Sequence, residues 1–328
     1  MASETVPEAE LHTAATSAAT SASGSASTSA STSVAAGRFR GLLALSRPGQ
    51  WIKSLLVVPL PLLDPAVWRL APILRVGAAL LAFTLASVIV YVVNDIGDRE
   101  RDRLHPVKRH RPLAAGRLPV PVAWLYAAVL SVVLGLLLAY GTLAVAVPVG
   151  AYLLLNAAYS RALKHVPLVD AFVVSCGFVL RAVAGCAAAG VEPSAWLLIC
   201  VFSLCLMLSF GKRRHELMLR GELHRPALRG YSVPYLDSLI LHTAVLTAIT
   251  YLLYLRTEVS AGPHGDAVML LSVPCAFFGL FRYLQLVLVS GEGGEPVRSV
   301  LHDRTMVVNS LVWGALLVGS LLAGQPPL

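Results

Sequence analysis

Long apolar stretches separated by short polar connections run through the chain after about residue 50. An α-helix needs about 20 apolar residues to cross the hydrocarbon core of a bilayer, and nine stretches reach or approach this length. They cover residues 50–66, 73–97, 119–139, 142–160, 167–189, 194–212, 235–255, 266–288 and 305–323. The first is the weakest, because it is short and contains Pro59 and Pro61, which kink a helix. The pattern predicts an all-α, polytopic membrane protein built as a bundle of about nine transmembrane helices.

The chain before the first apolar stretch has a different character. Residues 1–37 are rich in Ala, Ser and Thr and contain no apolar stripe. Such a segment buries too little apolar surface to offset the entropy of ordering. It also lacks the basic start and continuous apolar core of a signal peptide. We therefore predict a disordered cytoplasmic tail at 1–37 and a single transmembrane domain at 38–328.

The amino-acid composition also indicates a membrane protein. Soluble domains carry about a quarter charged residues, whereas this chain has 13% charged and 56% hydrophobic residues. The formal net charge is +8. In a membrane protein such an excess usually reflects the orientation of the loops and not nucleic-acid binding. We therefore expect no nucleic-acid partner.

The basic residues are distributed unevenly over the connections. Most of the 26 Lys and Arg lie before the first span or in the connections after the second, fourth, sixth and eighth spans. The positive-inside rule then predicts a multi-pass protein of the cell membrane with a cytoplasmic N-terminus and an external C-terminus. The two most charged connections, 98–118 and 212–234, would share the cytoplasmic face and could form one polar active-site chamber.

Three aspartates follow the second span. Asp95, Asp98 and Asp102 recur at i, i+3 and i+7, which is one face of a helix. Carboxylates on one face repel each other unless cations neutralise them, and Mg²⁺ is typically held by one or two carboxylates together with substrate phosphates. The spacing predicts a metal–diphosphate site. The alternative is a solvated helix end whose aspartates pair with the arginines of the same loop.

Polar groups around these aspartates extend the predicted site. Asn94 stands at the end of an apolar run, where a polar group is a functional candidate. Lys108 and Arg111 bracket a turn further along the same connection and are predicted to bind phosphate. For Arg99, Arg101 and Arg109, anchoring of the loop to the membrane surface is the favoured interpretation.

The fourth connection and the span after it supply further candidates. Tyr159 and Lys164 precede the fifth span, and Asp170 opens it. Lys164 could also extend to the membrane surface, and Asp170 could be a helix N-cap. Arg181 lies about three turns into the span, so we expect it to face a polar chamber or a carboxylate.

A second charged group closes the sixth span. Lys212, Arg213 and Glu216 follow Gly211 there. A positive-inside anchor explains the basic residues but not the glutamate. Glu216 is therefore a candidate metal ligand or base. The histidines follow no HExxH-type spacing, and the sequence has no Walker loop or GxSxG elbow.

Five segments, in order, resemble one protein family. They are RPGQWIKSLLVVPLPL (47–62), NDIGDRERDRLHPVKRHRPLAAG (94–116), YSRALKHVPLVD (159–170), GKRRHEL (211–217) and GEPVRSVLHDR (294–304). The second segment, in a nine-span helical protein, looks like the UbiA superfamily of intramembrane prenyltransferases, whose acidic motifs bind diphosphate through a metal ion. In detail the segments are similar to its decaprenyl-phosphate phosphoribosyltransferase branch.

This resemblance implies a UbiA-like transferase that uses Mg²⁺ or Mn²⁺. The donor would be 5-phosphoribosyl diphosphate (PRPP), the acceptor a polyprenyl phosphate, and the other product pyrophosphate. It implies catalytic roles for Asp95, Asp98, Asp102, Tyr159 and Lys164, with the three aspartates as metal ligands. It implies substrate or phosphate binding by Lys53, Asn94, Lys108, Arg111, Lys212, Arg213 and Glu216. The branch also implies a product destined for cell wall precursors, although ribosylation in secondary metabolism is equally compatible.

The chain departs from the pattern of this branch at three positions, and other functions stay open. Ser54 replaces the usual Asn, His215 replaces a small or hydrophobic residue, and Asp170 stands alone where prenyl-transferring relatives have a fuller acidic cluster. The main alternative is a prenyltransferase, or an isoprenoid cyclase, that uses an isoprenyl diphosphate, with an aromatic acceptor for the transferase. A transporter is a third possibility, but its ionisable groups would be expected near the bilayer midplane.

Overall fold

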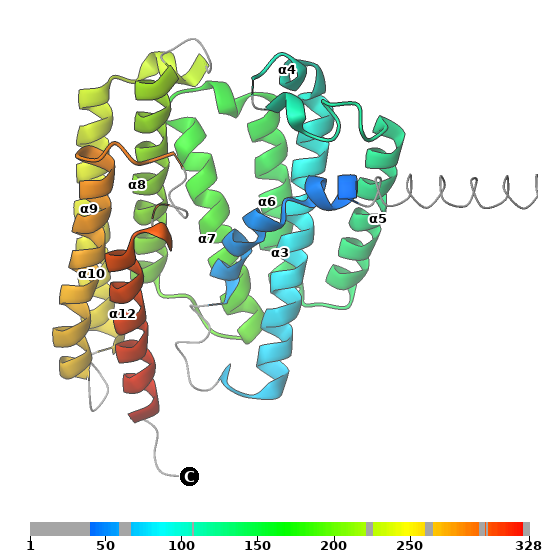
Figure 1. The fold of residues 1–328 in the computed structure, drawn as a ribbon. Coiled ribbons are helices and arrows are strands. Elements are labelled where there is room, and N and C mark those ends of the chain that lie inside the picture. The colour runs from blue at the N-terminus through cyan, green and yellow to red at the C-terminus, as the bar shows by residue number, and fades with distance from the viewer. Residues whose placement is uncertain are drawn as a thin grey trace, which may run out of the picture. The chain divides into compact units, whose positions relative to one another are not determined.

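Apolar helices make up most of the described chain (Figure 1). A computed structural model describes residues 40–58, 67–106, 108–220, 226–259, 265–294, 299 and 301–323. Within these residues no strand occurs, and seven helices are long and apolar enough to cross a membrane. They are α3 (Leu70–Gly97), α5 (Val120–Ala139), α6 (Leu143–Arg161), α7 (Val169–Ala189), α8 (Ala195–Arg220), α9 (Val233–Tyr254) and α10 (Gly265–Leu288). The all-α, polytopic fold predicted from the apolar pattern is confirmed.

The remaining helices are shorter or belong to the connections. A last long helix, α12 (Arg304–Ala323), coincides with the ninth predicted span, but its described apolar stretch, Arg304–Leu317, is shorter than the other seven. The connections contain α4 (Arg99–Arg103), η3 (Lys108–His110), η4 (Leu163–His165) and η6 (Pro226–Gly230).

The first predicted span, at 50–66, needs a correction. Its described part forms a 3₁₀-helix, η1 (Pro48–Val57), of 10 residues. At a rise of about 2.0 Å per residue such a helix extends about 20 Å, less than the roughly 30 Å of a bilayer core. The helix stops just before Val58, which precedes a proline, and this position disfavours helical backbone. The rest of that predicted span lies outside the described residues.

The described residues divide into two compact units. The first contains Tyr91–Leu130 and the described residues before Gln50, and the second contains Gln50–Val90 and the described residues from Ser131 onward. The division crosses α3 and α5. The predicted tail at 1–37 lies outside the described residues, and the single domain at 38–328 stays a prediction.

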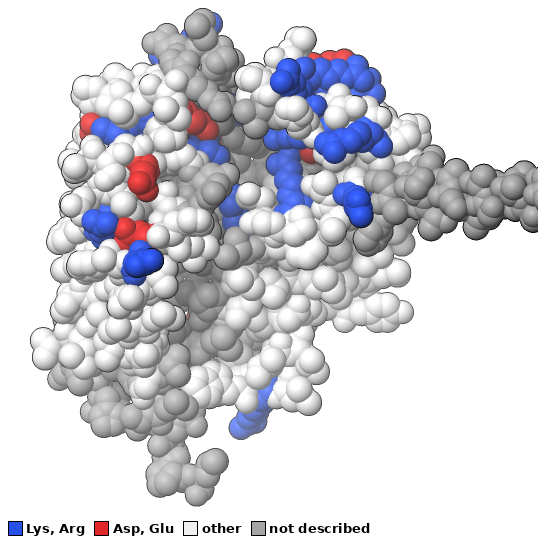
Figure 2. All heavy atoms as spheres, in the orientation of Figure 1, with Lys and Arg blue, Asp and Glu red and all other residues white. Residues whose placement is uncertain are grey.

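Large apolar side chains cover the outer faces of the long helices. On α5 the exposed residues include Trp124, Leu125, Val132 and Leu136. On the face drawn in Figure 2, charged side chains are sparse along the long helices. An apolar surface of this extent suits contact with lipid chains, because the bilayer core offers no water to solvate polar groups. With its seven apolar helices, the chain is an integral membrane protein.

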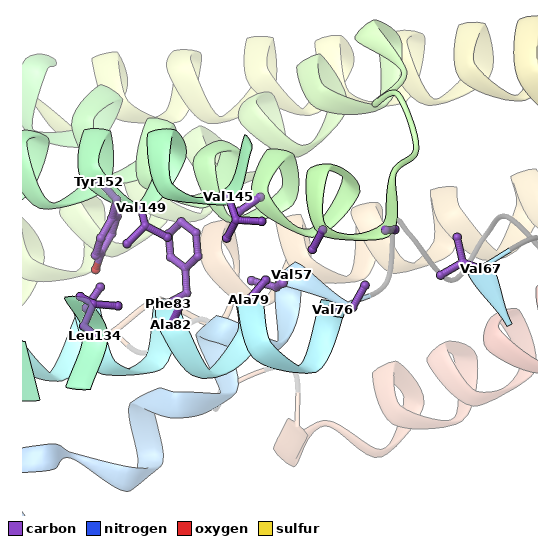
Figure 3. Close-up of a cluster of buried hydrophobic side chains, with 14 residues drawn as sticks. Val57, Val67, Val76, Ala79, Ala82, Phe83, Leu134, Val145, Val149 and Tyr152 are labelled. Atoms are coloured by element: carbon purple, nitrogen blue, oxygen red, sulfur yellow. The ribbon is translucent and has the colours of Figure 1, made fainter. Parts of the chain in front are cut away.

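Two large hydrophobic clusters and a smaller one lie within the second unit. In the first, Phe83 of α3 packs edge-on against Tyr152 of α6, with ring centroids 5.4 Å apart, and Val149 lies in the same cluster (Figure 3). Ala184 and Ala188 of α7 complete its contact surface. Small residues at such positions let helix backbones approach closely, which is how membrane helices gain packing energy.

The other large cluster positions the charged end of α8. Residues of α8, α9 and α10 form it, among them Phe210, Ile240 and Tyr283. At Gly211 a Cβ atom would lie 2.7 Å from the Tyr283 hydroxyl, so the Tyr283 side chain of α10 packs closely against this point of α8. The next residues on α8 are the charged segment from Lys212 to Glu216.

Candidate functional site

Helical hydrogen bonds continue past the end of α3, through the segment that contains Asp95, Asp98 and Asp102. That helix ends at Gly97 and α4 begins at Arg99. The Asp98 N–H donates to the Asn94 carbonyl at 2.8 Å, and the Asp102 N–H donates to the Asp98 carbonyl at 2.8 Å. The aspartates therefore keep a near-helical spacing across the junction, as the i, i+3, i+7 pattern predicts.

Four side chains form the first charged cluster: Arg47, Asp95, Asp102 and Arg111. One guanidinium nitrogen of Arg111, Nη1, donates to Asp95 Oδ1 at 3.0 Å and to Asp102 Oδ2 at 2.7 Å. Arg47 Nη2 donates to the same oxygen of Asp95, and its guanidinium lies 5.0 Å from the Tyr91 ring centroid. Both carboxylates are buried, at 4% and 3% exposure, so these arginines supply their compensating charge.

The other predicted residues of this connection have described contacts of their own. Asp98 is partly exposed, and its Oδ1 lies 4.0 Å from Arg101 Nη1 in an ion pair. Lys108 is exposed, and its backbone N–H donates to His105 Nδ1 at 3.3 Å. Asn94 stands one residue before Asp95 on α3. Of the predicted site residues in this connection, the structure thus gathers Asp95, Asp102 and Arg111.

Two other arginines of this connection pair with Glu100, and the anchoring interpretation stays a prediction. Arg99 and Arg103 both donate to Glu100, at 2.5 and 2.8 Å. Figure 2 shows basic and acidic side chains gathered where Figure 1 places α4. The hydrogen bond from Arg99 is the main cause that holds the pKa of the Glu100 carboxyl below its ordinary value. Arg103 also donates to the Ala114 carbonyl at 3.3 Å. Such exposed ion pairs contribute little to the stability of the fold.

The first charged cluster fits a divalent cation in part. Two buried carboxylates converge on a single cationic nitrogen, within 3.0 Å of it. Mg²⁺ prefers oxygen ligands and is commonly held by one or two carboxylates, water and substrate phosphates. Among the described residues no group of three or more His, Cys, Asp and Glu is gathered as a metal site. The chain therefore offers two converging carboxylates, and the remaining ligands would come from the substrate and water.

The second charged cluster lies in the other unit and consists of Asp170, Lys212, Arg213, Glu216 and Tyr231. Arg213 donates from Nε to Asp170 Oδ2 and from Nη1 to Glu216 Oε2, both at 2.7 Å. The Tyr231 hydroxyl donates to Asp170 Oδ1 at 3.1 Å. Lys212 Nζ lies 4.0 Å from Glu216 Oε1.

These contacts show which charged groups of the second cluster are paired inside the protein and which cation is accessible. Both oxygens of the fully buried Asp170 accept hydrogen bonds, so this carboxylate acts as a counter-ion within the protein. It is not the N-cap of α7, because Leu168 occupies that position. Arg213 is only 4% exposed and is bound to two carboxylates. Lys212, with 47% of its side chain exposed, is the more accessible cation of the pair.

Three further predicted residues belong to the same unit. Tyr159 lies in the last turn of α6, Lys164 lies in η4, and both are partly buried. Lys53 lies in η1 and is also partly buried. Their proposed roles in binding and catalysis stay predictions.

Of the two expectations for Arg181, the carboxylate partner is absent from its described contacts, and the polar chamber stays a prediction. Its hydrogen bonds go to uncharged groups: Nη1 donates to the Gly177 carbonyl at 2.9 Å, and Nη2 donates to Ser87 Oγ at 3.1 Å and Tyr152 Oη at 3.0 Å. Its guanidinium also lies 5.8 Å from the Phe83 ring centroid. Hydroxyls, a carbonyl and aromatic faces from three helices thus stabilise this buried charge in place of a carboxylate.

Two residues of these clusters were missed by sequence reasoning. Arg47 is one of the basic residues before the first span that were used only to predict membrane orientation, although it opens the segment RPGQWIK that carries the resemblance. Its place in a recurring motif was the available signal. Tyr231 gave no signal, because its contact with Asp170 spans 61 residues of sequence.

Comparisons with known proteins agree with this fold. A sequence model of the UbiA prenyltransferase family matches residues 66–296. The decaprenyl-phosphate phosphoribosyltransferase of Corynebacterium glutamicum is 35% identical, over 83% of this chain and 84% of that protein. The protein of the same name from Mycobacterium tuberculosis is 34% identical, over 86% of this chain and 94% of that protein.

A solved structure extends the likeness to the fold. The structure of a UbiA homolog from Archaeoglobus fulgidus bound to GPP and Mg²⁺ matches with a TM-score of 0.65. The match covers 86% of this chain and 99% of that chain at 18% sequence identity, so it is evidence for the fold alone. With the family match over most of its length, the chain belongs to the UbiA prenyltransferase family.

Proposed function

We propose that this protein transfers the 5-phosphoribosyl group of PRPP to a polyprenyl phosphate and releases pyrophosphate. The observation that carries the proposal is the similarity to decaprenyl-phosphate phosphoribosyltransferases, at 32–35% identity over 84–94% of their lengths. The five motif segments support it further. A membrane enzyme suits this reaction, because the donor is soluble in water and the acceptor phosphate lies at the level of the lipid headgroups.

The reaction is a substitution at C1 of the ribose. An oxygen of the lipid phosphate forms a bond to C1 while the bond from C1 to the diphosphate oxygen breaks. The diphosphate leaves with the bonding electron pair, and the sugar acquires oxocarbenium character in the transition state. The lipid phosphate is already ionised at neutral pH, so the step needs no strong general base. What the protein must supply is orientation and stabilisation of negative charge on the leaving group.

The first charged cluster is assigned to the leaving diphosphate. Asp95 and Asp102, with Asp98 nearby in sequence, would hold Mg²⁺ or Mn²⁺. Bound there, the cation would neutralise charge on the departing pyrophosphate. Arg111 and Arg47 already donate to these carboxylates, and guanidinium groups bind phosphate oxygens in the same manner. We therefore assign both arginines to the phosphates of the donor.

The second charged cluster is assigned to substrate phosphate through its accessible cation. Lys212 is the more exposed of the basic pair there, while Arg213 is bound to Asp170 and Glu216. We assign Lys212, together with Lys164, to a phosphate of the donor or of the acceptor lipid. The distribution of basic residues supports a cytoplasmic N-terminus and a cytoplasmic reaction, which remain part of the proposal.

The test is a transfer assay with purified protein in detergent or lipid nanodiscs. Radiolabelled PRPP, Mg²⁺ and a polyprenyl phosphate are incubated with the protein, and label is counted in the organic phase. We expect label in the lipid, its loss on addition of EDTA, and its return with excess Mg²⁺. An Asp95→Asn protein is the matched inactive control.

The contrary result is equally specific. An absence of labelled lipid from PRPP, together with product from an isoprenyl diphosphate and an aromatic acceptor, would make the chain a prenyltransferase. Transfer that continues at full rate in EDTA would remove the metal from the proposal but leave the donor and acceptor in place.

A further inference from the structure

We infer that Tyr231 is a positioning residue that holds the second charged cluster in its working arrangement. Its hydroxyl contacts two groups near the start of α7. The Leu168 N–H donates to the hydroxyl oxygen at 2.6 Å, and the hydroxyl donates its proton to Asp170 Oδ1 at 3.1 Å. The inference rests on the proposed function for its substrates but not for its geometry.

The backbone at Leu168 is strained, and the hydrogen bond from its N–H to Tyr231 helps to hold it in this conformation. Leu168 has φ 65° and ψ −52°, and the Val169 N–H donates to the Pro167 carbonyl at 2.8 Å. These values describe a γ-turn of the rare, strained kind. Strained backbone persists only where the surrounding structure enforces it, and it concentrates at functional sites. Tyr231 bonds to the central residue of this turn and to the carboxylate two residues later.

The segment that carries Tyr231 is packed directly against this turn. A Cβ atom at Gly230 would lie 2.4 Å from Pro167 Cγ and 2.7 Å from Pro167 Cβ. Only glycine fits at such a distance without a shift of the proline. The close approach brings the end of η6 onto the turn and presents the next residue, Tyr231, to Leu168 and Asp170.

From Asp170 the contacts continue to residues with access to solvent. Asp170 Oδ2 accepts from Arg213, and Arg213 donates onward to Glu216, whose other oxygen lies 4.0 Å from Lys212 Nζ. The chain Tyr231, Asp170, Arg213 and Glu216 thus runs from a buried hydroxyl to a partly exposed carboxylate. On the other side of the strained turn stands η4, which carries Lys164.

The Tyr231 hydroxyl stays protonated and can therefore always donate its hydrogen bond to Asp170. Burial, and then the charge of Asp170, raise the pKa of the Tyr231 hydroxyl. The hydroxyl therefore keeps its proton at physiological pH, and Asp170 keeps both hydrogen bonds. Without the Tyr231 bond, Asp170 Oδ1 would lose this hydrogen bond, and both the turn and the arginine would gain freedom.

The test compares two tyrosines of the same segment. Tyr231→Phe removes only the hydroxyl. Tyr235→Phe makes the same change at a half-exposed ring, stacked 6.4 Å away by centroid distance. We expect Tyr231→Phe to lower kcat/KM for PRPP by about tenfold, the effect of one lost hydrogen bond to a charged group. We expect Tyr235→Phe to match the wild type.

A double variant separates positioning from general stabilisation. If Tyr231 acts through Asp170 and Arg213 on Glu216, the Tyr231→Phe/Glu216→Gln protein will be no more than about twofold worse than the poorer single variant. A double variant whose loss in kcat/KM equals the product of the two single losses would overturn the inference. A Tyr231→Phe protein with wild-type kinetics would also overturn it, because the hydroxyl would then have no effect on the reaction. So would a variant that cannot be recovered folded, because the hydroxyl would then be needed for folding.

Failure of the proposed function gives a different result. In that case the wild type forms no ribosylated lipid but converts an isoprenyl diphosphate. The same variants are then compared in that reaction, because the hydrogen bonds of Tyr231 do not depend on the identity of the donor. A tenfold loss in Tyr231→Phe alone would support the positioning role there too, and unchanged rates would overturn it.

Discussion

Replacement of Arg111 by Gln tests the first charged cluster most directly. The change removes a guanidinium whose Nη1 contacts two buried carboxylates at 3.0 and 2.7 Å. At an effective dielectric constant of about 20, each contact corresponds to roughly 5 kcal/mol of Coulomb energy. Exposure of 30% of the Arg111 side chain admits screening water, and Asp95 keeps its contact with Arg47. A net loss of about 2 kcal/mol of stability is the reasonable expectation.

Stability and catalysis should change together in this variant. A loss of about 2 kcal/mol lowers the melting temperature by several degrees in a protein of this size. If Arg111 also binds the donor diphosphate, KM for PRPP should rise at least about tenfold, the usual effect of a lost charge-assisted contact. Thermal unfolding in detergent and initial rates over a range of PRPP concentrations measure the two effects.

Arg109→Gln is the matched control. Arg109 is an exposed arginine of the same connection, and the described structure pairs its Nε with the neighbouring His110 ring at 3.4 Å. We expect this variant to resemble the wild type in both measurements. Arg111→Gln with the stability and kinetics of Arg109→Gln would refute the reasoning. Lost stability with an unchanged KM for PRPP would leave Arg111 a purely structural counter-ion.

Three further predictions address other parts of the chain. Asp98→Ala should abolish transfer while membrane insertion persists, and activity near the wild-type level would remove Asp98 from the metal site. Arg181→Lys should destabilise the protein by about 2–3 kcal/mol, more than Arg181→Met, because lysine keeps the buried charge but cannot reach the partners of Arg181 together; unfolding in SDS titrations that ranks Met as the worse variant would contradict this. Hydrogen bonds from Arg282, Thr305 and the Met306 N–H hold the pKa of the Asp303 carboxyl below its ordinary value. The stability that Asp303 contributes is therefore full above about pH 4–5 and falls at lower pH, so the difference in melting temperature between wild type and Asp303→Asn should shrink on acidification; a constant difference would disprove the linkage.

The long helices could be predicted from sequence because hydropathy is a local property. A run of about 20 apolar residues must form a spanning helix, since the bilayer core leaves backbone groups no other partners. Seven predicted spans appear as such helices, and α12 covers the ninth. The stretch at 50–66 fails as a continuous α-helix in its described part, where the 3₁₀-helix η1 ends ahead of a proline.

The candidate site was predictable in its residue types but not in its pairings. The spacing of Asp95 and Asp102 placed them on one side of a helix, and Arg111 in the same connection contacts both. The spacing could not show that Arg47, 48 residues before Asp95, would contact the same carboxylate. Nor could it show that Arg181 would be stabilised by hydroxyls and aromatic rings.

Family membership, the membrane-spanning architecture and the chemical character of the charged connections were thus determined by the sequence itself. Each depends on residues close together in the chain. Tertiary structure alone decided which charges are compensated and by what. Arg47 meets Asp95 across 48 residues, and Tyr231 meets Asp170 across 61. Such contacts depend on how helices pack and where their connections close, and a buried charge is stable only once that packing supplies its partner.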